Sequence, residues 1–194
     1  MGWSLDQQWQ SAFWRMVKRP EHAGPLRDAA LKEHLRAWTA ALTATSVAAC
    51  QRLGWQASAK GHVLDLLPVP ASEYLVLDLI AFADSPRRWR FPVAVMEFEN
   101  SKKDDRIAYS LWKVLCVRAA LRVVFCYRRQ AVEAPALIHF LRDEVIQAMD
   151  PESRLKLGGH TIVVVGSRSD AETFPYGFFK WWWLDRNTGQ FHAA

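Results

Sequence analysis

The sequence predicts an α/β protein with a mixed central β-sheet flanked by helices. Apolar residues recur at helical spacing at the start of the chain and again after residue 104. Short runs rich in β-branched and aromatic residues lie between and after these segments, and turn-forming residues separate the runs. Helices and strands that succeed one another in this way pack as layers around a common core.

The first quarter of the chain is predicted to be helical. Ser4 and Gln7 have the spacing of a capping box, and the apolar residues that follow recur every three to four positions. The segment 18–25, KRPEHAGP, interrupts this first helix. Pro25 suits the first turn of a second, longer helix, which we expect to stop at Gly54.

The periodicity changes after residue 60. Three runs, 62–69, 73–82 and 91–99, are short, and turn residues separate them. We expect these runs to form three successive strands of a meander. The rest of the chain is predicted to contain a helix at 105–120, a buried strand at 121–127, a helix at 133–149, and two closing strands at 160–166 and 177–185.

The composition indicates a folded protein with an anionic partner. Hydrophobic residues make up 51% of the chain, which is enough for a sizeable core. The net charge of +5 favours nucleic acid as a partner, although 25 basic residues are nearly matched by 20 acidic ones. We see neither the apolar core of a signal peptide nor an apolar run of about 18 residues, so we expect a cytoplasmic protein with no membrane partner.

The cysteines lack the spacing of a metal site. Cys50, Cys116 and Cys126 are isolated, so the sequence indicates neither a zinc site nor a disulfide framework. All three lie in apolar contexts, and we expect core thiols.

Two acidic residues interrupt predicted strands that are otherwise apolar. Asp78 lies in the run 73–82 and Glu97 in the run 91–99, where Glu99 shares its face because alternate residues of a strand point the same way. A buried carboxylate costs several kcal/mol unless it is paired, protonated or bound to a metal. If the two strands are neighbours, the acids converge on one point, and hard ions such as Mg²⁺ or Mn²⁺ bind carboxylate oxygens.

Lys113 completes this candidate site from the helix that follows. An ammonium group there would offset negative charge on an attacked phosphate, and Glu99 would bind a second metal or accept a proton from water. Simpler interpretations remain open: the two glutamates occupy a solvated strand end, Asp78 caps a backbone group or pairs with an arginine, and Lys113 extends past an apolar helix face.

These residues resemble the PD-(D/E)XK nuclease superfamily, which has the restriction-endonuclease-like fold. Its core runs helix, three antiparallel strands, helix and strand, and corresponds to residues 25–127. The resemblance implies that Asp78 and Glu97 bind Mg²⁺ together with the backbone carbonyl of Phe98. Leu77 replaces the proline that precedes the first acid in the motif.

The motif lysine of the third strand is also replaced, by Glu99, which makes this an E-x-E variant. Some members of the superfamily carry a glutamate at that place, and others take a lysine from the next helix, which Lys113 resembles. Some members also use an acid of the first core helix, for which Glu33 is the best-placed candidate. Asp65 is the rival for the first acid. Asn100 is expected to hold the Glu99 carboxylate or a water, or to be a plain turn residue.

The resemblance implies one nuclease-like domain over residues 1–194, with an N-terminal helical appendage (1–24), a core (25–127) and a C-terminal extension (128–194). We therefore expect a magnesium-dependent endonuclease, a hydrolase that cleaves phosphodiester bonds in DNA. The alternative is a catalytically inactive module of the same fold that binds nucleic acid or protein. The missing motif lysine favours that alternative, in which the tryptophans near the two ends form a homodimer or partner surface.

Overall fold

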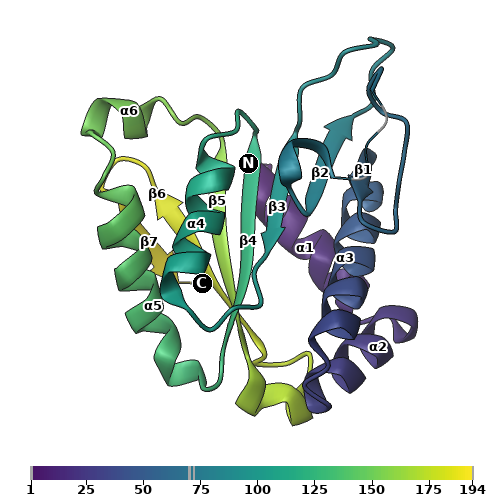
Figure 1. Ribbon diagram of the computed structural model, residues 1–194, viewed down its shortest axis with the longest axis vertical. Helices are drawn as coiled ribbons and strands as arrows, with labels where there is room; N and C mark the ends of the chain where they lie inside the picture. The colour runs from purple at the N-terminus through teal and green to yellow at the C-terminus, as the bar shows by residue number, and fades with distance from the viewer. Residues whose placement is uncertain (1, 70, 72, 194) are drawn as a thin grey trace.

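The computed structural model describes residues 2–69, 71 and 73–193 of the chain. Within these residues it contains a seven-stranded sheet in which the strands lie side by side in sequence order (Figure 1). The strands are β1 (Trp55–Ala59), β2 (Leu79–Ala83), β3 (Ala94–Phe98), β4 (Leu121–Arg128), β5 (His160–Ser167), β6 (Phe179–Asp185) and β7 (Gln190–Ala193). Neighbouring strands are antiparallel, except that β4 is parallel to both β3 and β5.

Helices cover both faces of the sheet. They are α1 (Leu5–Val17), α2 (Pro20–Leu31), α3 (Leu35–Arg52), α4 (Asp104–Leu115), α5 (Ala134–Leu141) and α6 (Pro151–Leu155). Helices α1 and α3 pack on one face, and α4 and α5 pack on the other (Figure 1). The molecule therefore has the predicted α/β architecture, a mixed sheet between two helical layers. No helix of the described residues is long and apolar enough to cross a membrane.

Helix α1, which the resemblance assigned to an appendage, lies in the core. Trp9 and Phe13 are fully buried. The Phe13 ring is 5.2 Å from that of Phe125 on β4 and 5.7 Å from that of Trp181 on β6, measured between centroids. These contacts join the two tryptophan-rich ends of the chain by aromatic packing within the core.

The predicted first strand, 62–69, is wrong. The strand that pairs with β2 is β1, which begins directly after Gly54 and pairs along its whole length, from Trp55 with Ala83 to Ala59 with Leu79. Gly54 has a positive φ of 75°, so it turns the chain sharply at the end of α3. The predicted second strand is shorter than expected, because residues Tyr74–Val76 form a 3₁₀ turn and β2 starts at Leu79.

The predicted long helix is divided in two. Helix α2 starts at Pro20 rather than Pro25 and ends at Leu31, and α3 starts at Leu35. Glu33 in the intervening turn has a φ of 50°, which no helix continues through. The break lets both helices bury their apolar side chains in the same core cluster, which contains Leu26 and Trp38.

Three smaller features also differ from the predictions. The helix expected at 133–149 consists of α5 and a π-helical segment, Arg142–Ile146. Strand β7 was not predicted; it forms a hairpin with β6. Cys50 and Cys126 are buried as expected, but Cys116 is exposed, because it caps the end of α4.

Candidate active site between β2, β3 and α4

The two acids that interrupt the strands lie opposite each other. Strands β2 and β3 are antiparallel and pair Leu79 with Met96, so Asp78, directly before β2, comes beside Glu97. The backbone N–H of Asp78 donates a hydrogen bond to Oε1 of Glu97 at 3.4 Å. The backbone N–H of Phe98 donates to Oδ2 of Asp78 at 2.7 Å. The register of the hairpin thus brings both carboxyl groups to one end of the β2–β3 pair.

Helix α4 brings a cation to the same point. Its apolar stripe, which includes Ile107, Leu111 and Val114, is buried against the sheet. Lys113 lies at the edge of this stripe, and its Nζ is 2.8 Å from Oε2 of Glu97. The same ammonium group donates a hydrogen bond to the backbone carbonyl of Val76 at 2.8 Å, which ties α4 to the turn before β2.

Ser110 is a site residue that the sequence reasoning missed. Its hydroxyl donates to Oε2 of Glu97 at 3.4 Å, and its side chain is buried. Ser110 and Lys113 are three residues apart on a helix and therefore share a face. That spacing was the available signal, because a polar residue one turn from Lys113 on the side that faces the sheet can reach the same acid.

Burial and crowding raise the pKa values of both acids. The Glu97 side chain is almost completely buried, and this burial raises its pKa to about 7, against the opposing effect of Lys113. Burial also raises the pKa of Asp78; the N–H of Phe98 opposes that shift, and the charges of Glu73 and Glu99 add to it. The carboxyl groups therefore lie where additional positive charge would stabilise their ionised forms.

We expect the stability of the metal-free protein to fall as the pH rises from 4.5 to 7. In this range folded Glu97 keeps a proton that a glutamate with the ordinary pKa of 4.5 has lost in the unfolded chain. The free energy of unfolding then decreases with pH, by about 3 kcal/mol for a shift of this size. Urea unfolding in EDTA across this range, for the wild type and Glu97→Gln, measures the effect. Equal slopes for the two proteins would contradict it.

Glu99 stands at the rim of the site. It directly follows β3, and its backbone N–H donates to the carbonyl of Phe125 on β4 at 2.9 Å. Its Oε1 accepts a hydrogen bond from the N–H of Ser101 at 2.7 Å, and the side chain is half-buried. Its charge contributes to the raised pKa of Asp78, so it lies within electrostatic reach of that acid.

Asn100 bonds to helix α3, and no hydrogen bond among the described residues joins it to the Glu99 carboxylate. Its Nδ2 donates to Oγ1 of Thr39 at 2.6 Å, so the side chain connects the end of β3 to helix α3. The carboxylate of Glu99 is held by Ser101 instead. Asn100 lies two residues after Phe98, which packs in the core cluster that contains α3, so side-chain alternation along the extended chain points Asn100 toward the same helical layer.

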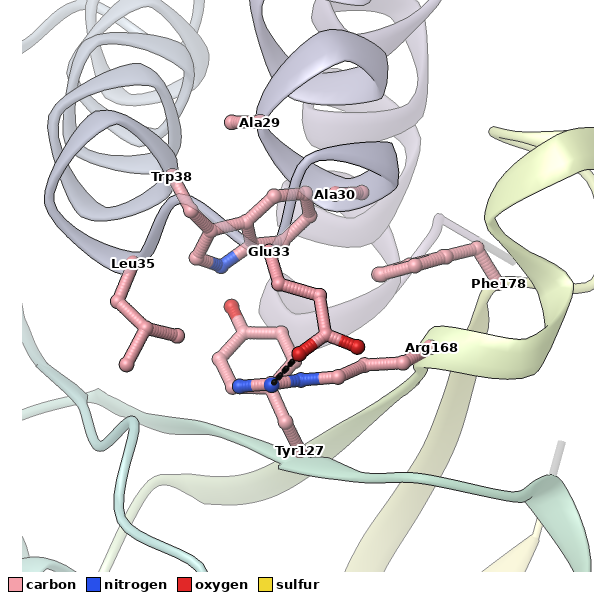
Figure 2. Close-up of a pocket in the computed structure, with 8 residues that line it drawn as sticks. All are labelled: Ala29, Ala30, Glu33, Leu35, Trp38, Tyr127, Arg168 and Phe178. Carbon is pink, nitrogen blue, oxygen red and sulfur yellow. Dashed lines mark ion pairs between the residues drawn. The ribbon is translucent and has the colours of Figure 1, made fainter.

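The structure separates Glu33 from the two central acids. Its carboxylate forms an ion pair with Arg168, at 3.7 Å, across a cavity of about 20 Å³. Figure 2 shows this pair beside Tyr127, with Trp38 and Phe178 around it. Because the chain turns at residues 32–34, Glu33 faces the end of β5 instead of lying on a core helix that faces β2.

Asp65, the rival for the first acid, is exposed in the loop between β1 and β2. That position follows from the corrected strand assignment, because residues 62–69 pair with the sheet only through the bridge between His62 and Ala59. No described contact joins Asp65 to either central acid.

The donor set fits a hard divalent ion. Mg²⁺ is commonly bound through one or two carboxylates and keeps several waters, and Asp78 and Glu97 supply two neighbouring carboxyl groups. Their raised pKa values indicate that bound positive charge would be favourable there. Within the described residues, no group of three or more Asp, Glu, His or Cys side chains is arranged to bind a metal. A third ligand would therefore come from the backbone, as the resemblance implies for Phe98, or from water.

The site thus combines Asp78, directly before β2, with Glu97 of β3 and one lysine of α4. The accessory candidates have other surroundings: Glu33 pairs with Arg168, Asn100 bonds to Thr39, and Asp65 is exposed. Glu99 stands beside the site without a direct contact to the lysine among the described interactions. Comparisons of the chain with protein-family models, with curated proteins and with solved structures found no match.

Proposed function

We propose that this protein is a metal-dependent nuclease that hydrolyses phosphodiester bonds in DNA, and a variant member of the PD-(D/E)XK superfamily. The observation that carries the proposal is the meeting of Asp78, Glu97 and Lys113 from three separate elements. A buried acid, Glu97, beside a half-buried acid and a lysine is unusual inside a protein, because each charge withdrawn from water is costly unless it has a partner or a task.

The order of the elements supports the proposal. Helix α3 is followed by the antiparallel strands β1, β2 and β3, then by helix α4 and the parallel strand β4. This succession corresponds to the core of the superfamily, with β1 in place of the strand expected at 62–69. The acids come from the start of the second strand and from the third strand, as in the motif.

Each side chain has a role in the proposed reaction. Asp78 and Glu97 would bind Mg²⁺ or Mn²⁺, which when bound polarises a phosphodiester and lowers the pKa of a water. Lys113 would move from Glu97 toward a phosphate oxygen and stabilise the negative charge that develops there. Glu99 at the rim would accept the proton of the attacking water.

A nicking assay tests this function. We expect purified protein to convert supercoiled plasmid DNA to the nicked form with Mg²⁺ or Mn²⁺, and to lose this activity in EDTA. Either metal is also expected to raise the melting temperature, because it binds the folded state only. Absence of both responses would contradict the proposal.

One observation favours the non-catalytic alternative. The Glu97 carboxylate already has an internal cation at 2.8 Å, so its charge is partly compensated without any metal. A module of this kind would bind nucleic acid in EDTA and would not cleave it when metal is added. Of the six tryptophans near the two ends, Trp9, Trp181 and Trp182 are buried in the core, so these three cannot contribute to a homodimer surface. Trp3 is exposed.

A further inference from the structure

Two aromatic rings stand exposed on helix α4 beside the candidate site. Tyr109 and Trp112 each expose 54% of their surface. Their rings are stacked, with centroids 5.8 Å apart and planes 24° from parallel. Other aromatic residues are also exposed, among them Trp89 and Phe91, but within the described residues only Tyr109 and Trp112 form a stacked pair of exposed rings.

Lys113 lies between this aromatic pair and the acids. Nζ of Lys113 is 5.9 Å from the centre of the Tyr109 ring and 2.8 Å from Oε2 of Glu97. A phosphate at the candidate site would therefore have an aromatic surface within the length of one nucleotide.

The turn before β2 adds apolar surface to the same region. Leu75 and Val76 expose 64% and 79% of their surface, and the carbonyl of Val76 accepts the Lys113 hydrogen bond. Both residues have positive φ angles, 57° and 56°. This conformation is strained, most of all for a β-branched valine, and such strain is concentrated at functional sites. Here it aims a carbonyl at Lys113 and leaves two apolar side chains in solvent.

Basic residues extend the surface along α4. Arg106 lies one helical turn before Tyr109, and Lys102 and Lys103 precede the helix; all three are exposed. Asp104 at this end is paired with Arg128, which compensates part of the negative charge there. The exposed face thus carries cations, then a stacked aromatic pair, then Lys113 at the site.

We propose that Tyr109 and Trp112 form a stacking platform for unpaired nucleobases, so that the preferred substrate is single-stranded nucleic acid. The inference rests on the proposed nuclease function for the position of the scissile phosphate. Aromatic rings bind single strands through base stacking without sequence preference, and neighbouring cations bind the backbone. A base held in a duplex is stacked on its neighbours and cannot offer its face to the rings.

Binding in EDTA tests the platform separately from catalysis. Fluorescence anisotropy would measure the affinity for labelled oligothymidylate, for an abasic oligomer of the same length and for a duplex. We expect the oligothymidylate to bind tightest. The double variant Tyr109→Ala/Trp112→Ala should weaken its binding at least about fivefold for each base that loses its stacking partner. It should change binding of the abasic oligomer little.

Two further variants complete the design. Trp112→Phe keeps an aromatic ring and should retain most of the affinity. Trp3→Ala removes another exposed tryptophan, before α1 on the other helical layer, and should have no effect. Equal affinity for duplex and single strand, equal affinity for the abasic oligomer, or unchanged binding by the double variant would each overturn the platform.

The two proposals fail in different ways. Base-dependent binding that the double variant loses, without any metal-dependent cleavage, would support the platform and contradict the nuclease. Cleavage with metal by a double variant that binds oligothymidylate normally would contradict the platform and leave the nuclease standing.

Discussion

Replacing Glu97 by glutamine is expected to abolish metal-dependent nicking of plasmid DNA and to leave the fold intact. The Glu97 carboxylate contacts Lys113, Ser110 and the backbone N–H of Asp78, so it joins the lysine of α4 to the acid before β2. Glutamine has nearly the same shape but no charge with which to bind a divalent ion. Mutation of a residue that only orients a metal ligand typically lowers metal affinity or activity by about 10- to 100-fold. Loss of a ligand itself should therefore lower the rate at least about a hundredfold.

The initial rate of plasmid nicking in Mn²⁺ would measure this effect, with circular dichroism to verify the fold. The matched control is Glu33→Gln, the same substitution at an acid that the structure places with Arg168. Asp78→Asn is expected to lose nicking in the same way as Glu97→Gln. Its matched control is Asp65→Asn, because Asp65 is exposed in a loop. Full activity in Glu97→Gln, or a comparable loss in either control, would exclude the assignment of the site.

The largest loss of stability is expected from Arg122→Met. Arg122 lies on β4 with only 2% of its surface exposed. Its guanidinium donates to three backbone carbonyls, those of Val117 at 3.1 Å, Gly158 at 2.9 Å and Leu157 at 3.0 Å. These carbonyls belong to the segments that lead into β4 and β5, so one side chain holds the starts of two central strands together.

Methionine can fill the space of the arginine stem but cannot donate to any of the three carbonyls. Losing the donors of such a buried network costs about 3–5 kcal/mol. Urea denaturation at neutral pH would measure the free energy of unfolding. Arg118→Met, at an exposed arginine a few residues earlier, is the control and should change stability by less than about 0.5 kcal/mol. A loss below about 1 kcal/mol in Arg122→Met would show that water replaces the guanidinium.

Arg122 itself shows where local pattern is insufficient. In the sequence it stands inside the apolar run LRVVFCY, and nothing in that run distinguishes a buried arginine from one at a solvated strand end. Burial lowers the pKa of its guanidinium, with a smaller contribution from Arg186. The three carbonyls that compensate for this burial lie five and more than thirty residues away along the chain, so only the folded chain reveals them.

The convergence of the central acids could be anticipated from the sequence. Asp78 and Glu97 interrupt apolar segments, and the cost of an isolated buried carboxylate requires that each have a partner. Antiparallel neighbours joined by a short connection bring such residues together with few alternatives. Lys113 followed from the helical period of the next segment, because that period sets which residues face the sheet.

Local signals therefore sufficed for the class of most main elements, for the neighbouring positions of the strands predicted at 73–82 and 91–99, and for the acid pair. The reason is that side-chain periodicity and desolvation act over a few residues. They did not suffice to choose β1 over 62–69, since both segments are compatible with a strand and the choice depends on which one pairs with β2. They also misplaced Glu33, because the chain turns at that residue to bury Leu26 and Trp38 in one cluster. Pairing and burial of this kind are properties of the whole folded chain, and distant segments must be in contact before either can contribute any free energy.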